Sequence, residues 1–217
     1  MGKRGPKPKG KVKIEWSPNF AYAIGLIASD GNLSSNGRHI VFVSKDSEQI
    51  ENFLRALGIE NHISRDNTKI WRVQFSDVLF YRFLITIGLI PNKSKILRGI
   101  EVPEKYFFHF LRGVFDGDGS TYSYWDKRWR SSFMYYVCFA SASPVFIEWL
   151  RIQIETSLLV KGHVTHSKGK NTGQLKYAKQ DGLKLLRRMY AGPKASIHLS
   201  RKYLKIQQML SIVGERL

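Results

Sequence analysis

The chain has 217 residues, of which 43% are hydrophobic, so it can bury one substantial core or two small ones. Its 35 Lys and Arg outnumber 17 Asp and Glu, and the formal charge of +18 favours a polyanionic partner, nucleic acid before a membrane surface. The one cysteine, Cys138, excludes an internal disulfide or a cysteine-based zinc site. No apolar run of membrane-spanning length and no signal peptide is found, so we expect an intracellular protein without a membrane partner.

Residues 1–16 form a basic N-terminal tail. Residues 1–13 are rich in Lys, Arg, Pro and Gly and contain no acid, a composition that cannot build a core. Two roles are open for this tail: an arm that inserts into a DNA minor groove, or a charged segment with only nonspecific affinity for phosphates. Both predict affinity for DNA, but only the first predicts a preference for A·T pairs.

Apolar periodicity and turn residues predict the remaining elements in chain order. For residues 17–100 we expect helices at 17–29, 47–57 and 77–87, a turn over 32–38, and strands at 39–44, 62–64 and 70–76. For residues 101–217 we expect helices at 109–117, 143–158, 181–190 and 201–213, and strands at 120–125, 133–140, 163–166 and 174–178. The order αββαββα thus occurs twice, which predicts an α+β protein with a duplicated unit and two saddle-shaped antiparallel sheets.

Two short segments of these units are nearly alike. Residues 23–31 read Ala-Ile-Gly-Leu-Ile-Ala-Ser-Asp-Gly, and residues 111–119 read Leu-Arg-Gly-Val-Phe-Asp-Gly-Asp-Gly. A glycine inside a helix costs about 1 kcal/mol relative to alanine, so Gly25 and Gly113 indicate two helices packed closely about a pseudo-twofold axis. Asp30 and Asp118 would then lie side by side at the helix C-termini, an arrangement that requires cations.

This repeated motif resembles the motif of the LAGLIDADG homing endonucleases. The likeness covers about residues 20–203, and two motifs in one chain are similar to the monomeric, pseudo-symmetric branch of that family. The resemblance implies the LAGLIDADG fold and a site-specific endonuclease that makes a double-strand break with short 3′ overhangs in a long DNA target. The first copy departs from the pattern at positions one, two, six and seven. At position six, Ala28 replaces the acid that the second copy retains as Asp116.

Carried onto this sequence, the resemblance makes Asp30 and Asp118 the essential acids, each binding metal at one scissile phosphate. The backbone carbonyls of Ser29 and Gly117 would assist them. Because the ligands are oxygens and the reaction is at phosphate, Mg²⁺ is the expected ion. Mn²⁺ would substitute for it, whereas Ca²⁺ would bind without supporting efficient cleavage.

Other site residues follow from the same resemblance. The family has a basic residue in each half, and the matching stretches 92–97 and 193–198 favour Lys93 and Lys194, with simple phosphate contacts as the alternative. A polar residue that organises water in the family maps to the strand ends, where Asp46 and Ser143 are the candidates. A role as helix N-cap is an equal alternative for both.

Twisted two-stranded ribbons fit the DNA major groove, where alternate side chains face the base edges. Because the strand phase is open, we expect only part of the polar strand and turn residues to contact double-stranded DNA. The candidates in the first unit are Asn32, Ser34, Asn36, Arg38, His39, Arg65, Asn67, Lys69, Arg72 and Gln74. Those in the second are Ser120, Tyr122, Tyr124, Lys127, Arg128, Trp129, Arg130, Lys168, Lys170, Asn171, Gln174 and Lys176.

Two other functions are compatible with the same fold. One is a noncatalytic DNA-binding regulator, which the intact Asp30 and Asp118 disfavour. The other is an RNA-binding intron maturase, which the sequence does not distinguish from a nuclease. In each case we expect a monomer, because both motifs lie in one chain.

Overall fold

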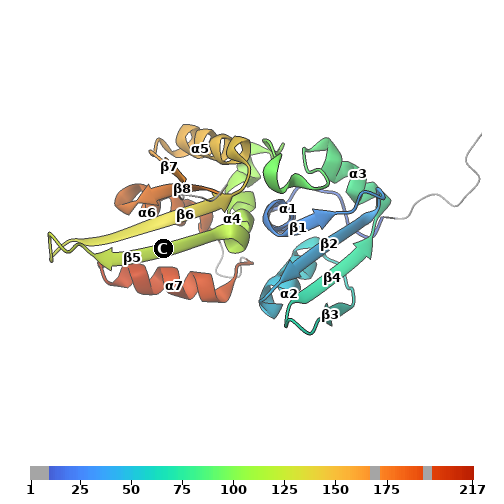
Figure 1. Cartoon of the computed structure of the whole chain (residues 1–217), viewed down its shortest axis with the longest axis horizontal. Coiled ribbons are helices and arrows are strands. Elements are labelled where there is room, and N and C mark those ends of the chain that lie inside the picture. Colours follow the sequence, from blue (N-terminus) through green and yellow to red (C-terminus); the bar gives the residue numbers. More distant parts are fainter. Residues whose placement is uncertain (1–9, 167–171, 193–196) are drawn as a thin grey trace, which may run out of the picture.

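The chain folds into two halves with the same element order, as the computed structural model shows for residues 10–166, 172–192 and 197–217 (Figure 1). The first half contains α1 (Pro18–Ser29), β1 (Gly31–Leu33), β2 (His39–Ser44), α2 (Ser47–Leu57), β3 (Ile63–Arg65), β4 (Trp71–Ser76), α3 (Val78–Thr86) and the 3₁₀ turn η1 (Lys93–Lys95). The second contains η2 (Glu104–Tyr106), α4 (Phe107–Asp118), β5 (Gly119–Trp125), β6 (Phe133–Ser141), α5 (Pro144–Leu158), β7 (His163–His166), β8 (Gly173–Ala178), α6 (Lys179–Met189) and α7 (Ser200–Ser211).

Each half has one four-stranded antiparallel sheet. The strand orders are β1-β2-β4-β3 and β5-β6-β8-β7, so the two sheets share one topology. Helices α1 to α3 pack on one face of the first sheet and α4 to α6 on one face of the second, and the other faces stay open. The predicted α+β fold with two antiparallel sheets is confirmed.

Local sequence signals explain where the helices begin and end. Ser17 caps α1 by accepting a hydrogen bond from the Phe20 amide at 3.1 Å, and Pro18 follows at the first helical position. Asp77 caps α3 in the same way. Helix α2 ends at Gly58, whose φ of 64° suits glycine because a side chain there is strained.

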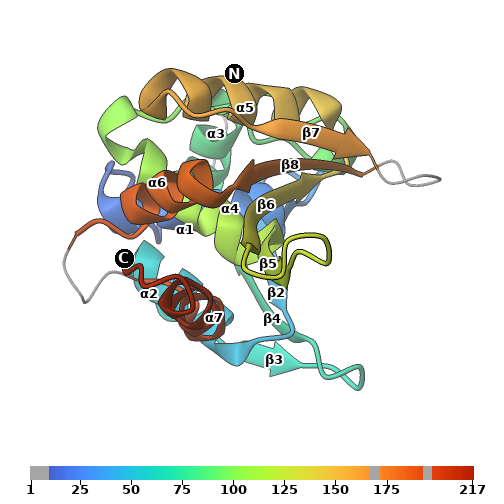
Figure 2. The same cartoon turned by 90° about the vertical axis from the view of Figure 1, so that its left-hand side faces the viewer.

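Helices α1 and α4 lie side by side between the two sheets (Figures 1 and 2). A Cβ atom added to Gly25 would lie 2.9 Å from the Gly113 Cα, and one added to Gly113 would lie 3.0 Å from the Gly25 Cα. The two glycines therefore let the helix backbones touch, and the structure brings them together as the repeat indicated. We call this α1–α4 contact the seam.

Helix α7 is an addition to the αββαββα unit. It lies beside the edge strand β5, and Lys205 on it donates a hydrogen bond to the Thr121 carbonyl at 2.6 Å. Its first turn also lies against α2 of the first half (Figures 1 and 2). Within the described ranges, no helix has both the length and the apolar character needed to cross a membrane.

Candidate active site

Two carboxylates meet where the seam helices end. Asp30 is the residue that follows the last turn of α1, and Asp118 is the last residue of α4. A Cβ atom added to Gly117 would lie 2.9 Å from Asp30 Oδ2, so Asp30 lies directly against the end of α4. The two acids of the repeat therefore share one place at the junction of the halves.

The surroundings of these acids disfavour their charged forms. Burial, reinforced by the charge of Asp118, raises the pKa of Asp30 to about 6. The pKa of Asp118 is also raised, because protein surrounds most of this carboxylate even though its side chain reaches solvent. Both acids are thus stabilised by any cation that binds beside them.

Lys93 supplies one such cation. It is buried at the start of η1, with only 7% of its surface exposed. Its ammonium group donates hydrogen bonds to the carbonyls of Ser29, at 3.5 Å, and Gly31. Lys93 therefore lies at the C-terminal end of α1, where free helix carbonyls attract positive charge.

Lys202 supplies the second cation from the first turn of α7. Its ammonium group donates three hydrogen bonds of 2.7–2.8 Å to the end of α4, at the carbonyls of Phe115, Gly117 and Gly119. Gly117 and Gly119 are the counterparts of Ser29 and Gly31 in the repeated segment. Lys202 is thus the pseudo-symmetric equivalent of Lys93.

Burial weakens the charge of both lysines. It lowers the pKa of Lys93 to about 8, and the acids Asp118 and Asp30 partly oppose the shift. It also lowers the pKa of Lys202 to about 8, again against the pull of neighbouring acids. Two carboxylates and two ammonium groups therefore form one mutually dependent cluster.

The sequence did not identify Lys202. It favoured Lys194, which lies outside the described residues, because residues 193–198 resemble residues 92–97. The signal available was a lysine on the apolar stripe of the last helix, in line with the buried Ile206 and Met209. A longer connection before α7 than before η1 obscured the match.

Gln49 is a second residue that the sequence missed. It is buried in α2, and its Nε2 lies 3.1 Å from the Asp116 carbonyl and 3.4 Å from Asp30 Oδ2. Ser44 donates to its Oε1 at 2.6 Å, which fixes the orientation of the amide. Gln49, on helix α2 of the first half, thus donates a hydrogen bond that orients the Asp30 carboxylate.

Asp46 and Ser143, the predicted water-organising residues, have other contacts. Ser143 is fully buried; its hydroxyl accepts from the Phe146 amide at 3.3 Å and donates to the Leu97 carbonyl at 2.5 Å, which is the N-cap role. Asp46 occupies the N-cap position of α2 without a capping bond and pairs with Arg201 at 2.7 Å. Within the described part of the chain, neither side chain hydrogen-bonds to Asp30 or Asp118.

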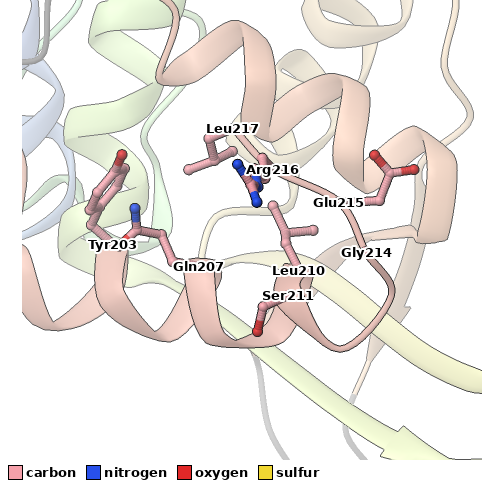
Figure 3. A pocket seen from close by; sticks show the side chains of 8 residues that line it. All are labelled: Tyr203, Gln207, Leu210, Ser211, Gly214, Glu215, Arg216 and Leu217. Carbon is pink, nitrogen blue, oxygen red and sulfur yellow. The ribbon is translucent and has the colours of Figure 1, made fainter.

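A cavity of about 320 Å³ opens beside Asp118 between the two halves. It is lined by Ala28, Ser29, Lys93, Ser94, Leu97, Asp118, Ala140, Ser141, Ala142 and Thr172. A larger cavity of about 500 Å³ lies along α7 and the segment that follows it, and Figure 3 shows Tyr203, Gln207 and Leu210 among its lining residues. Because neither acid lines the larger cavity, the smaller one is the candidate site.

The strand registers decide which predicted DNA contacts lie on the open faces. On the first sheet these are Asn32, His39, Arg72 and Gln74, and on the second Ser120, Tyr122, Tyr124, Gln174 and Lys176. The candidates in the connections between strands are Ser34, Asn36, Arg38, Asn67, Lys69, Lys127, Arg128, Trp129 and Arg130. Lys168, Lys170 and Asn171 lie outside the described residues.

Arg65, another candidate DNA contact, does not lie on the open face of the first sheet. Arg65 pairs with Trp71 in the register of β3 and β4, and its guanidinium lies 4.8 Å from the centre of the Trp71 ring. Trp71 packs against the core, so Arg65 lies on the helix side of the sheet. The stacking of the guanidinium on an indole ring, which sequence alone does not reveal, holds it there.

Three tyrosines form a row on the open face of the second sheet. The rings of Tyr122 and Tyr136 stack at 4.8 Å, and those of Tyr124 and Tyr136 lie 6.3 Å apart and nearly parallel. The Lys176 ammonium lies 5.8 Å above the Tyr122 ring. We call Tyr122, Tyr124 and Tyr136 the tyrosine row.

Comparison with known sequences finds a likeness over part of the chain. No family model matches the chain. An uncharacterized protein of Methanocaldococcus jannaschii is 30% identical over 119 residues, which cover 50% of this chain and 41% of that relative's length. The match therefore spans about two fifths of the relative.

Solved structures extend the likeness to most of the chain. The I-LtrWI LAGLIDADG homing endonuclease bound to target DNA has a TM-score of 0.61 at 10% identity and covers 91% of each chain. I-DmoI in complex with DNA and Ca has a TM-score of 0.57 at 12% identity and covers 87% of this chain and 97% of its own. Full-length DUF199/WhiA from Thermatoga maritima has a TM-score of 0.58 at 15% identity and covers 94% of this chain and 64% of its own. These likenesses establish the LAGLIDADG fold.

Proposed function

We propose that the chain is a site-specific endonuclease that cuts both strands of double-stranded DNA with the help of divalent metal ions. One observation carries the proposal: Asp30 and Asp118 meet at the seam, each at a helix end that also holds one lysine, Lys93 or Lys202. The two strands of a duplex are themselves related by local twofold axes. Two equivalent sets of acid and lysine therefore suit two scissile phosphates, one on each strand.

The residues at the seam fit hard divalent cations. Asp30 and Asp118 offer oxygen ligands, and because burial raises the pKa of each, a bound cation would stabilise their charged forms. Mg²⁺ is the expected ion; Mn²⁺ would substitute, and Ca²⁺ would bind without efficient cleavage. When bound, such ions activate a water and stabilise the leaving oxygen. Solved complexes of I-DmoI with DNA contain Mg, Mn or Ca, which supports this assignment.

The chain's own residues then have distinct tasks. Asp30 and Asp118 would hold the metal ions through their carboxylate oxygens, one acid at each scissile phosphate. Lys93 and Lys202 neutralise the charge that develops on each phosphate during attack, and their pKa near 8 leaves both mostly protonated at pH 7. Gln49 keeps the carboxylate of Asp30 in one orientation.

The open sheet faces supply the contacts to DNA. They carry the polar side chains of Asn32, Arg72 and Gln74 in one half and the tyrosine row with Lys176 in the other. With a net charge of +18, the protein attracts the phosphate backbone along its length. We propose that residues 17–100 and 101–217 each read one half of a long target as a monomer, and that cleavage leaves short 3′ overhangs.

Cleavage of a randomised DNA library tests the proposal. The purified chain is incubated with the library and Mg²⁺, and the cut ends are sequenced. We expect one enriched long site with staggered ends, which disappears with either Asp30→Asn or Asp118→Asn while affinity for DNA persists. Full cutting by either variant would show that the acids are not the metal ligands.

A specific feature favours a second candidate function, DNA binding without cleavage. The carbonyls of Ser29 and Gly117, expected to assist metal binding, accept hydrogen bonds from Lys93 and Lys202 instead. Lysines can therefore neutralise the acids without metal. Tight, salt-sensitive binding with no cutting in the library experiment would support this candidate, and RNA would be tested next.

A further inference from the structure

The seam is polar on one side and apolar on the other. Tyr22 on α1 donates a hydrogen bond of 2.7 Å to Asp116 Oδ2 on α4, and both side chains are buried. The repeat places Phe110 and Ala28 at the equivalent positions on the opposite side. Neither of these side chains has a polar atom, so this hydrogen bond has no counterpart on the opposite side of the seam.

Asp116 also binds the start of α7. Its Oδ2 accepts a hydrogen bond of 2.8 Å from the backbone amide of Leu199, the residue before the first residue of that helix. Lys202 follows within the first turn and donates to the carbonyls on either side of Asp116 in α4. The beginning of α7 is therefore attached to the end of α4 at two adjacent points.

Arg112, one turn earlier on α4, makes the third attachment. It is 1% exposed, and its guanidinium donates to the Met189 carbonyl at 2.7 Å and the Ile197 carbonyl at 3.0 Å. Met189 ends α6 and Ile197 precedes α7, so Arg112 holds the chain on both sides of that connection. The equivalent of Arg112 in the first unit is the apolar Ile24.

Stability alone does not require these polar residues. Burying a carboxylate and a guanidinium is costly, and a well-packed apolar core is often at least as stable. The other side of the same seam shows that Phe110, Ile24 and Ala28 can occupy the equivalent positions. Directed hydrogen bonds do, however, fix one arrangement where apolar contacts allow several.

We infer that Tyr22, Arg112 and Asp116 are positioning residues that set the place of Lys202 and thereby control cleavage of only one DNA strand. The inference rests on the proposed function and extends it to an unequal pair of half-sites. On the other side, the Ser143 hydroxyl binds the Leu97 carbonyl just beyond η1, so Lys93 is placed by a different contact. Cleavage of the two DNA strands thus depends on different contacts within the protein.

Strand-resolved cleavage tests the inference. Tyr22→Phe removes only the hydroxyl bound to Asp116. A triple variant, Tyr22→Phe with Arg112→Ile and Asp116→Ala, copies the residues of the apolar side. On the library-derived target, labelled separately on each strand, we expect Tyr22→Phe to slow one strand about three- to tenfold and the triple variant about 100-fold, with the other strand within about twofold. Nicked circles would accumulate before linear DNA.

Tyr190→Phe is the matched control. The Tyr190 hydroxyl is buried and interacts electrostatically with Asp116, but it makes no hydrogen bond within the described residues. Its removal takes the same atom from the same cluster without breaking the contact to Asp116. Equal cleavage of both strands is expected, whereas a strand-selective loss like that of Tyr22→Phe would overturn the role assigned to the hydrogen bond.

A second measurement does not depend on nuclease activity. Acetic anhydride labelling followed by peptide mass spectrometry reports how often each lysine is exposed. We expect Lys202 to react about three- to tenfold faster in Tyr22→Phe, with Lys93 unchanged, because the Asp116 carboxylate that binds the Leu199 amide at the start of α7 loses the hydrogen bond that orients it. If the triple variant does not fold, the labelling result for Tyr22→Phe alone tests the inference.

The outcomes separate the two proposals. Wild-type protein that cuts neither strand contradicts the proposed function, and the labelling experiment then still tests the position of Lys202. Wild-type protein that cuts, with variants that slow both strands equally, overturns the inference alone. Unchanged labelling of Lys202 in Tyr22→Phe and in a folded triple variant overturns it as well.

Discussion

At the scale of single residues, the centre depends on charges that oppose their surroundings. Asp30 lies where burial and the neighbouring Asp118 both disfavour its ionised form, and Lys93 and Lys202 lie where burial disfavours theirs. Each group is tolerated because the others are present. A change in the protonation of one member is therefore expected to affect the whole cluster.

The pH dependence of cleavage follows from these shifts. The proposed metal binding requires an ionised Asp30, and since the pKa of Asp30 is raised to about 6, the cleavage rate is expected to rise as pH increases through 6. The pKa of both lysines is lowered to about 8, so their charge and the rate fall above pH 8. A rate measured from pH 5 to 9 at a fixed Mg²⁺ concentration below saturation should be bell-shaped. A flat profile across pH 6 would contradict the assignment of Asp30.

Removing either lysine should slow cleavage of one DNA strand more than cleavage of the other. Lys93→Met and Lys202→Met are each expected to slow one strand about 100- to 1,000-fold, because each removes the cation beside one scissile phosphate. Lys205→Met is the control, since Lys205 lies on the same helix as Lys202 but donates to Thr121. Gel separation of nicked and linear plasmid measures the outcome. Equal slowing of both strands by each variant would show that the lysines act only through general DNA affinity.

At the scale of elements, the seam determines how closely α1 and α4 approach. Gly25→Ala places a Cβ against the backbone of α4, so we expect a loss of about 3 kcal/mol or more in the free energy of unfolding. Gly173→Ala is the control because its nearest neighbours lie 3.6 Å away or more, and a change below about 1 kcal/mol is expected. Urea unfolding measures both. A loss for Gly25→Ala no greater than for the control would mean that the helices can separate slightly at no cost.

The tyrosine row predicts unequal reading of the two half-sites. The stacked rings of Tyr122, Tyr124 and Tyr136 give the open face of the second sheet an aromatic row that has no counterpart on the described strands of the first. The apolar feature of the major groove is the thymine methyl group. Replacing thymine by deoxyuracil in the half-site under the second sheet should weaken binding about tenfold, and less in the other half. A competition assay with each hybrid duplex measures this, and equal losses in both halves would contradict it.

Sequence reasoning succeeds for elements defined by local signals. The caps of α1 and α3 and the glycine after α2 stand beside clear apolar periodicity, and the repeat revealed the seam before any coordinates. It failed where a contact between separate elements decides the place of a side chain. Lys202 is recognised by carbonyls more than eighty positions away, and Arg65 is held by the ring of a neighbouring strand. Local patterns carry no record of such contacts.

At the scale of the whole molecule, the charge of +18 predicts steep salt dependence of DNA binding. With several phosphate contacts, affinity should fall about 10³- to 10⁵-fold between 50 and 200 mM salt. Deleting residues 1–13 is expected to reduce this slope similarly on all sequences, if the tail contacts phosphates only. Fluorescence anisotropy measures the affinity of the full-length and the shortened chain for matched DNA duplexes. A loss confined to A·T-flanked sites would support an arm in the minor groove.

The unequal sides of the seam also govern which halves can associate. Two copies of the second half would place each buried Asp116 opposite Phe110, so that each Asp116 would lose the hydrogen bond that Tyr22 donates. Two copies of the first half would bring two Tyr22 hydroxyls against Ala28 and leave them without an acceptor. In the unlike pair, by contrast, the Tyr22 hydroxyl has the Asp116 carboxylate as its acceptor. If the two halves were produced as separate chains, the seam would therefore favour the heterodimer over either homodimer.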